Sequence, residues 1–190
     1  MTVNEIRYSF SEHILYTKEE CRDILKYKTN VERTKYSVKL EKDFEKKGGY
    51  MMSQDLVPNK ENQWIFDRMK NYVKCNYPVE WLEDPHGVFR EYSKGDFFVE
   101  HTDHVQWKIG TKKNVRLFAI SIQLTPVGNF EGGELMVNRI TEASKEQGSL
   151  ALFGSQVIHE VKTITSGSRD SLVFFVSVFV LLFLQYARLF

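Results

Sequence analysis

Two histidines and one aspartate are the residues whose types and spacing favour metal chemistry. His101 and Asp103 are separated by one residue in GDFFVEHTDHVQWK, and His159 lies in the strand-like run FGSQVIHEVKTI. On a β-strand, side chains i and i+2 point the same way, so His101 and Asp103 can reach one ion together. His104 then faces away unless the strand ends or bulges there. A histidine in a strand-like run has little reason to be there without a partner, so His159 is the best third candidate ligand.

Two imidazoles and one carboxylate can hold one face of an octahedral ion and leave three positions open, as in non-haem Fe(II) oxygenases. Structural zinc prefers four protein ligands, usually with cysteine, and neither Cys21 nor Cys75 is near this set in sequence. Catalytic zinc stays open as an alternative and would need a general base. The adjacent carboxylates, Glu100 and Glu160, should point away on a strand. A hydrogen-bonded strand end or a polar loop is the simpler explanation of an HxD pair by itself.

Arg169 strengthens the metal hypothesis. It lies ten residues after His159, across the turn-like stretch TSGSR, at the expected start of the last apolar strand. An unpaired buried charge is costly, so an arginine entering a buried strand needs an anionic partner. A planar guanidinium suits a carboxylate bidentately. The alternatives are a salt bridge to a core Asp or Glu, and an exposed arginine at the strand start.

The elements that must position these residues change in character near residue 86. Before it, two helical patterns dominate: one opens with the capping-box pattern Thr17-x-x-Glu20, and the other, NKENQWIFDRMKNYVKCNY, has Asn59 as a candidate cap. Between them, TKYSVKLEK is a candidate edge strand. After residue 86, short apolar runs alternate with Gly-containing breaks. We expect strands near 87–93, 96–104, 115–125, 134–138, 149–153, 157–164 and 171–179.

This order of elements predicts an α+β fold, mainly β, with a sandwich or barrel and helices packed on one sheet. In the apolar run VRLFAISIQLTP, Ala119, Ser121 and Gln123 share one face, because strand side chains alternate. Two polar groups on one face of a buried strand indicate a polar pocket, or else partners elsewhere in the core. A length of 190 residues suits one ordinary domain.

Charge and cysteine content narrow the partners and the compartment. The 26 basic and 25 acidic residues nearly cancel, which argues against a nucleic-acid or anionic-membrane partner. Two cysteines without a CxxC motif, and an N-terminus without a signal-peptide pattern, favour a cytoplasmic location. The apolar run from Leu172 to Leu184 is shorter than the roughly 20 residues of a spanning helix. We interpret it as a buried strand running into a terminal strand or helix, with a membrane or partner-binding tail as the alternative.

The order and spacing of His101-x-Asp103, His159 and Arg169-x-Ser171 resemble the 2-oxoglutarate/Fe(II)-dependent dioxygenase superfamily, especially its prolyl 4-hydroxylase-like branch. REYSKGDFFVEHTDH resembles the segment that ends in HxD, and VRLFAISIQLTPVGNFEGGEL the strand, loop and Gly-Gly-x-Leu turn that follow it. GSLALFGSQVIHEVKTITSGSRDSLVFFVS resembles the segment with the second histidine and the cosubstrate-binding basic residue. Together these segments span 87–178, about half the chain.

The resemblance implies a double-stranded β-helix, a jelly-roll or cupin-like barrel with helices against its larger sheet. A single domain, 1–190, would then comprise a helical N-terminal support region (1–85), the catalytic core (86–180) and an apolar C-terminal tail (181–190). The implied cofactors are Fe(II), 2-oxoglutarate and O₂, with ascorbate dependence following from the family. The implied site residues are the iron ligands His101, Asp103 and His159, and the cosubstrate residues Arg169, Tyr92, Gln123 and Ser171.

Two positions depart from the family pattern. Gln123 falls where relatives often place a tyrosine, and Phe98 stands where many relatives carry one. Phe175 occupies the position, six residues after Arg169, where the nucleic-acid demethylase branch has a second arginine, so a nucleic-acid substrate is not expected. The stretch VQWKIGTKKNVR, with Trp107 and Lys108, is a candidate substrate loop or an ordinary hairpin.

The activity implied by the resemblance is hydroxylation of a substrate C–H bond, with release of succinate and CO₂. The substrate would be a prolyl or other protein residue, or a small molecule. A zinc-dependent hydrolase, or a non-catalytic metal-binding cupin-like module with the same three ligands, is the alternative. The sequence does not indicate whether the chain is monomeric or oligomeric.

Overall fold

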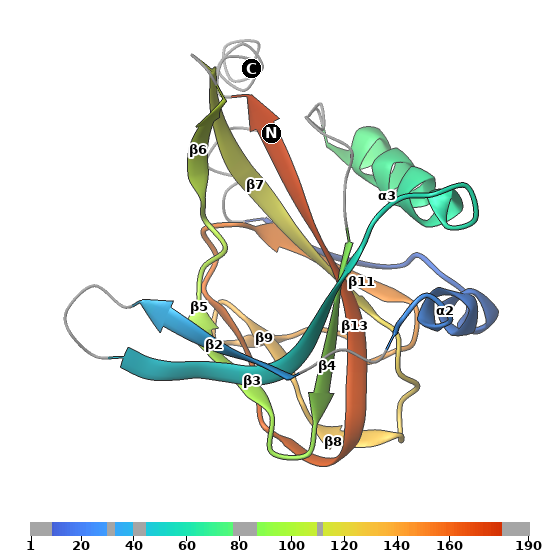
Figure 1. Ribbon diagram of the computed structural model, residues 1–190, viewed down its shortest axis with the longest axis vertical. Helices are drawn as coiled ribbons and strands as arrows, with labels where there is room; N and C mark the ends of the chain where they lie inside the picture. The colour runs from blue at the N-terminus through green and yellow to red at the C-terminus, as the bar shows by residue number, and fades with distance from the viewer. Residues whose placement is uncertain (1–8, 30–32, 40–44, 78–86, 110–111, 180–190) are drawn as a thin grey trace.

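Antiparallel strands make up most of the computed structural model, which describes residues 9–29, 33–39, 45–77, 87–109 and 112–179 (Figure 1). The strands are β1 (Phe10–Ile14), β2 (Arg33–Lys39), β3 (Glu45–Leu56), β4 (Gly87–Ser93), β5 (Phe97–His101), β6 (Gln106–Ile109), β7 (Lys112–Gln123), β8 (Phe130–Gly132), β9 (Leu135–Val137), β10 (Thr141–Glu142), β11 (Ser149–Gly154), β12 (His159–Val161) and β13 (Ile164–Phe179). The helices are α2 (Lys18–Leu25) and α3 (Gln63–Asn76).

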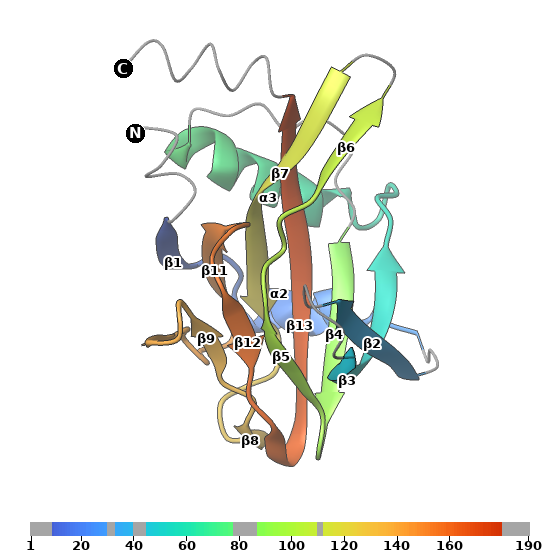
Figure 2. The ribbon, with the colours of Figure 1, turned by 90° about the vertical axis from the view of Figure 1, so that its left-hand side faces the viewer.

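The strands pair in the order β1-β11-β7-β13-β4-β3-β5-β12-β9-β10. β2 adds to β3, β6 to β7 and β8 to β13. Figures 1 and 2 show this sheet curling on itself, with β7, β13 and β4 on one side and β5, β12 and β9 on the other. The fold is therefore the predicted mainly β jelly-roll barrel, and its interior lies between these two sets of strands.

Strand alternation in β7 gives the sheet two different faces, as the sequence pattern predicts. Phe118, Ile120 and Ile122 belong to a buried cluster that also contains residues of α2 and α3. Ala119 belongs to a second cluster, inside the barrel. Both helices therefore cover the outer face of the side formed by β7, β13 and β4, on the right in Figure 1. The inner face of these strands is left for the site.

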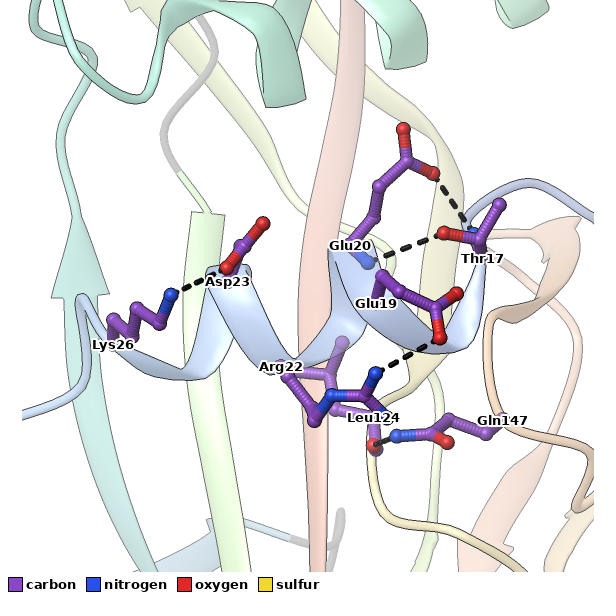
Figure 3. Close-up of polar contacts among 8 residues, drawn as sticks. All are labelled: Thr17, Glu19, Glu20, Arg22, Asp23, Lys26, Leu124 and Gln147. Carbon is purple, nitrogen blue, oxygen red and sulfur yellow. Dashed lines mark hydrogen bonds and ion pairs between the residues drawn. The ribbon is translucent and has the colours of Figure 1, made fainter.

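The capping box predicted for the first helix is present (Figure 3). The Thr17 side chain accepts a hydrogen bond from the Glu20 backbone N–H, while the Glu20 carboxylate accepts one from the Thr17 N–H at 2.8 Å. These bonds satisfy backbone donors that no helical carbonyl can reach. The candidate cap of the second helix is wrong, because α3 begins at Gln63 and Asn59 instead accepts from the backbone N–H groups of Glu61 and Asn62.

The N-terminal region is less helical than predicted. The expected edge strand is β2, but β1 and the twelve-residue β3 also lie in this region and join the barrel. β3 has the sequence EKKGGYMMSQDL, which lacks the alternation that signals a strand locally. Pairing with β4 and β5, about 40 residues further along, makes it a strand.

Strand limits near the candidate site also differ from prediction. β5 ends at His101, so 96–104 is not one continuous strand. β13 begins at Ile164, and the stretch TSGSR lies inside it rather than forming a turn. The register of β13 with β8 shifts between Ile164 and Ser166. Gly167 has φ of +70°, and after it β13 leaves β8 to pair with β4 and β7. The Gly and Ser residues thus mark a local irregularity in a long strand.

The apolar C-terminal run is a strand as far as Phe179, and the tail at 181–190 lies outside the described residues. Neither α2 nor α3 is long and apolar enough to cross a membrane. Cys21 and Cys75 lie in these two helices, and both are free thiols. The cytoplasmic location stays a prediction.

Candidate metal centre and cosubstrate pocket

The register of β5 with β12 brings the two predicted histidine ligands together. His101 and His159 are direct partners in this antiparallel pair, and their ring centroids are 4.1 Å apart. Asp103 completes the set: its Oδ2 lies 3.2 Å from His159 Nε2, and its Oδ1 lies 3.8 Å from His101 Nε2. The three ligand atoms lie within 4.8 Å of one another, so one metal ion can reach all of them.

Backbone carbonyls fix the orientation of both imidazoles. His101 Nδ1 is 2.8 Å from the Val99 carbonyl oxygen, and His159 Nδ1 is 3.0 Å from that of Val157. A carbonyl oxygen only accepts, so each Nδ1 is the donor, and the Nε2 of a neutral ring keeps its lone pair for a metal ion. Both Nε2 atoms face Asp103.

The protonation states also suit a metal site. Burial, together with the nearby His159, lowers the pKa of His101 to about 4. Burial by itself raises the pKa of Asp103, but the neighbouring His159, His101 and Arg116 hold it below the ordinary value. Near neutral pH, a neutral His101 and an ionised Asp103 are the forms that bind metal.

Strand alternation is not what aims Asp103 at the histidines. Because β5 ends at His101, Asp103 lies in the irregular segment 102–105. Its backbone N–H donates to the Ser155 carbonyl at 2.9 Å, and its carbonyl accepts from Arg116 Nη1 at 3.2 Å. The structure thus brings the three predicted residues together, but the structural reason is the path of a loop. His104 is not in the ligand set; its ring Nε2 accepts a hydrogen bond from the Gln106 amide at 3.0 Å.

The two carboxylates considered as a general base lie away from the site, as expected. Glu100 is paired with Arg139 at 2.8 Å, and Glu160 with Lys162 at 2.6 Å. Among the residues that the structure describes, Asp103 is the only carboxylate lining the cavity beside the ligands. A hydrolytic mechanism would therefore lack a separate base here.

A cavity of about 60 Å³ adjoins the three ligands and leaves room for small molecules beside them. It is lined by the ligands, by three of the predicted cosubstrate residues and by apolar side chains from both sides of the barrel. These apolar lining residues include Phe98, Leu135, Phe153, Val161 and Phe175. Open coordination positions next to such a cavity suit a metal that must bind a cosubstrate.

Arg169 lies in the wall of the same cavity and is only 4% exposed. Its Nε donates to Gln123 Oε1 at 2.9 Å, and its guanidinium carbon lies 5.8 Å from the Tyr92 ring centroid. Burial lowers the pKa of Arg169. No carboxylate of the described residues lies within ion-pair distance of it, so both simpler explanations, a core salt bridge and an exposed arginine, fail for this part of the chain.

Sheet pairing places the other predicted cosubstrate residues around Arg169. Tyr92 on β4 is its direct partner, and Ser171 on β13 pairs with Gln123 on β7. Gln123 uses both ends of its amide, because its Nε2 donates to the Thr125 carbonyl at 2.9 Å. The geometry thus makes Gln123 a support for the guanidinium.

The predicted substrate loop is a β-hairpin in its backbone. Trp107 pairs with Asn114, and Lys108 pairs with Lys113, across β6 and β7. The side chains of Trp107 and Lys108 lie outside the described residues. Figure 2 shows this hairpin at the top of the view, with the end of β13 beside it. Its role in substrate binding stays a prediction.

Sequence reasoning missed Arg116, which lies beside Asp103. Its guanidinium carbon is 3.5 Å from the centroid of the Phe175 ring. The sequence did contain a signal for it, because Arg116 is a charged residue within the apolar run VRLFAISIQ. A strand that is buried on both faces does not hold a charged side chain without a partner.

Fold and ligand set together define a class: metal-dependent barrels with two histidines and one carboxylate on inward-facing segments. Residues 87–177 match the family model of the 2OG-Fe(II) oxygenase superfamily. This match confirms the resemblance predicted from the motifs.

Two curated relatives match part of this chain. A PKHD-type hydroxylase of Prochlorococcus marinus is 33% identical over 88 residues, which cover 44% of this chain and 38% of the relative. A second PKHD-type hydroxylase, from Idiomarina loihiensis, is 28% identical over 117 residues, covering 58% and 50%. The chain thus spans half or less of the length of these relatives.

The similar solved structures include a Pseudomonas putida prolyl-4-hydroxylase, with a TM-score of 0.59 and 17% identity over 93% of this chain and 97% of that one. A viral collagen prolyl hydroxylase of Paramecium bursaria Chlorella virus-1 has a TM-score of 0.65 and 12% identity, over 89% and 96%. At this identity, the likeness establishes the shared fold.

Proposed function

We propose that the chain is an Fe(II)- and 2-oxoglutarate-dependent dioxygenase that hydroxylates a substrate C–H bond and releases succinate and CO₂. The observation that carries the proposal is Arg169, a buried guanidinium in the wall of the cavity that also holds the three candidate metal ligands. A dicarboxylic 2-oxo acid has one end for a metal and another for a guanidinium, so it matches both features of the cavity.

In this proposal each residue has a distinct task. His101, Asp103 and His159 hold Fe(II), which, when bound with 2-oxoglutarate and O₂, supplies the oxidising chemistry. Arg169 binds the distal carboxylate of 2-oxoglutarate and so orients the molecule, and Gln123 holds the guanidinium in place. The apolar cavity walls exclude water from the reacting groups. No side chain has to act as a general acid or base.

The substrate we favour is a prolyl or other protein residue, with a small molecule as the second choice. The names of the relatives, PKHD-type hydroxylases and prolyl hydroxylases, support this choice. A structure of a Trichoplax adhaerens prolyl hydroxylase holds a peptide fragment of a hypoxia-inducible factor. Ascorbate dependence stays a prediction from the family.

A zinc hydrolase with the same ligands is the rival proposal, and two observations disfavour it. The cavity holds no described carboxylate besides Asp103 to serve as a base, and hydrolysis has no use for a buried guanidinium. A non-catalytic module would have no need to keep all three ligands together with Arg169.

The test begins with metal-free chain under anaerobic conditions. Adding Fe(II) and 2-oxoglutarate should give a weak visible absorption band that appears only when both are present. Asp103→Ala, as the control, should give no band. Succinate release is then measured with peptides, free amino acids and nucleic acids as substrates. A folded chain that gives neither the band nor succinate rules out the proposed activity.

A further inference from the structure

Two irregular segments next to the candidate metal site are joined to each other. Segment 102–105 follows β5 and carries Asp103, while the turn after β11 begins at Ser155 and leads to His159. The Asp103 N–H donates to the Ser155 carbonyl at 2.9 Å. The loop that supplies one ligand is therefore hydrogen-bonded to the turn that precedes another.

Ser155 also fixes this turn to the neighbouring strand β7. Its Oγ donates to the Arg116 carbonyl at 2.7 Å, and its N–H donates to the Leu117 carbonyl at 2.8 Å. The residue is only 3% exposed, so water does not compete for these bonds. One buried serine thus connects segment 102–105, β7 and the turn before β12.

Arg116 closes the connection from the other side. Its Nη1 donates to the Asp103 carbonyl at 3.2 Å, and its backbone N–H donates to the Val105 carbonyl at 3.0 Å. Its guanidinium lies against the face of Phe175, which restrains the side chain. Asp103, Ser155 and Arg116 therefore form a closed ring of hydrogen bonds, and each member holds the next.

We infer that Ser155 and Arg116 are positioning residues that hold Asp103 in register with His159 for metal binding. Neither belongs to the ligand set. Because segment 102–105 has no regular structure, this ring supplies the rigidity that a strand would otherwise give. The inference rests on the metal-binding part of the proposed function alone and requires neither 2-oxoglutarate nor turnover.

The first test compares two buried serines at opposite ends of β11. Ser155→Ala removes a hydroxyl from the ring, and Ser149→Ala removes a hydroxyl that donates to the Ser144 carbonyl at 3.0 Å. Ser149 is 4% exposed, so the two substitutions are closely matched. The Kd for Co(II) and the melting temperature are measured on the metal-free full chain. We expect Ser155→Ala to weaken Co(II) binding about tenfold or more, as other supporting partners of metal ligands do. The Kd of the control Ser149→Ala for Co(II) should stay within about twofold of the wild-type value, while its melting temperature falls by about as much as that of Ser155→Ala.

The second test uses Arg116→Lys, which keeps the positive charge near Asp103 but loses the planar donor. It should also weaken Co(II) binding, and combining it with Ser155→Ala should weaken binding by less than the product of the two single effects, since both act through one ring. Equal Co(II) affinity of Ser155→Ala and Ser149→Ala, or fully multiplicative effects, would overturn the inference. A chain that follows this pattern with Co(II) yet never consumes 2-oxoglutarate would contradict only the proposed function.

Discussion

Arg169→Met is the substitution that tests the cosubstrate site most directly. Methionine is unbranched and similar in length, so it fills much of the same space without the charge. Arg169 is 4% exposed and donates to Gln123, which would lose its donor in the variant. That loss costs about 1–3 kcal/mol, while removing a buried guanidinium offsets part of it. The variant should therefore fold, and its effect should appear in binding.

The expected loss of affinity for 2-oxoglutarate follows from the burial of the pair that Arg169 would form with the distal carboxylate. Removing one partner of a buried, hydrogen-bonded charge pair costs about 2–5 kcal/mol, or about 30- to 5,000-fold in affinity. The wild-type chain should therefore prefer 2-oxoglutarate to 2-oxovalerate, which carries a methyl group in place of the distal carboxylate. In Arg169→Met this preference should largely disappear, because 2-oxovalerate never used the guanidinium.

The assay is calorimetric titration of both 2-oxo acids into Fe(II)-loaded chain without oxygen. The four dissociation constants form a cycle in which any general change in the cavity cancels. Arg169→Lys serves as the control, because it keeps a cation but not the planar donor pair. Its preference for 2-oxoglutarate over 2-oxovalerate should lie between those of the wild-type chain and Arg169→Met. An unchanged preference for 2-oxoglutarate in Arg169→Met would refute the assignment of Arg169 to the distal carboxylate.

Three further predictions use other parts of the molecule. Asp103→Ala should abolish Fe(II) binding and 2-oxoglutarate consumption, whereas His104→Ala should retain most of both; equal losses would contradict the candidate ligand set. In the metal-free chain, the free energy of unfolding should rise by up to about 3 kcal/mol between pH 4 and 6.5, because in that range the unfolded chain binds a proton that buried His101 does not. Urea unfolding should show this rise, and His101→Gln should flatten it; an unchanged slope in the variant would assign the effect to other groups. Phe66→Ala should cost about 3–5 kcal/mol in urea unfolding, because this fully buried ring contacts Phe174 and fixes α3 to the sheet; a loss below about 1 kcal/mol would mean that α3 contributes little to stability.

Several elements were predictable because their signals are local. The Thr17-x-x-Glu20 pattern specifies its own helix start, since both bonds join residues three apart. The polar face of β7 at Ser121 and Gln123 follows from the two-residue period of a strand. Such features need no knowledge of distant segments.

Other elements depended on distant partners and were not predictable from local patterns. β3 is a strand because β4 and β5 pair with it, although its own sequence is charged and irregular. β13 continues through TSGSR because β8 pairs with its first residues and β4 and β7 with the rest. In both cases hydrogen bonding between strands outweighs local preference.

For the site, the sequence by itself determined which residue types are available: two histidines, one aspartate and an arginine, in an order that resembles one superfamily. The tertiary structure decided how they meet. The register of β5 with β12 puts His101 opposite His159, and a ring through Ser155 and Arg116 aims Asp103 at them from a loop. Gln123 likewise supports Arg169 only because β7 and β13 are neighbours. Chemical identity is carried by single residues, whereas distances between segments some 55 residues apart are set by the pairing and packing of the whole barrel.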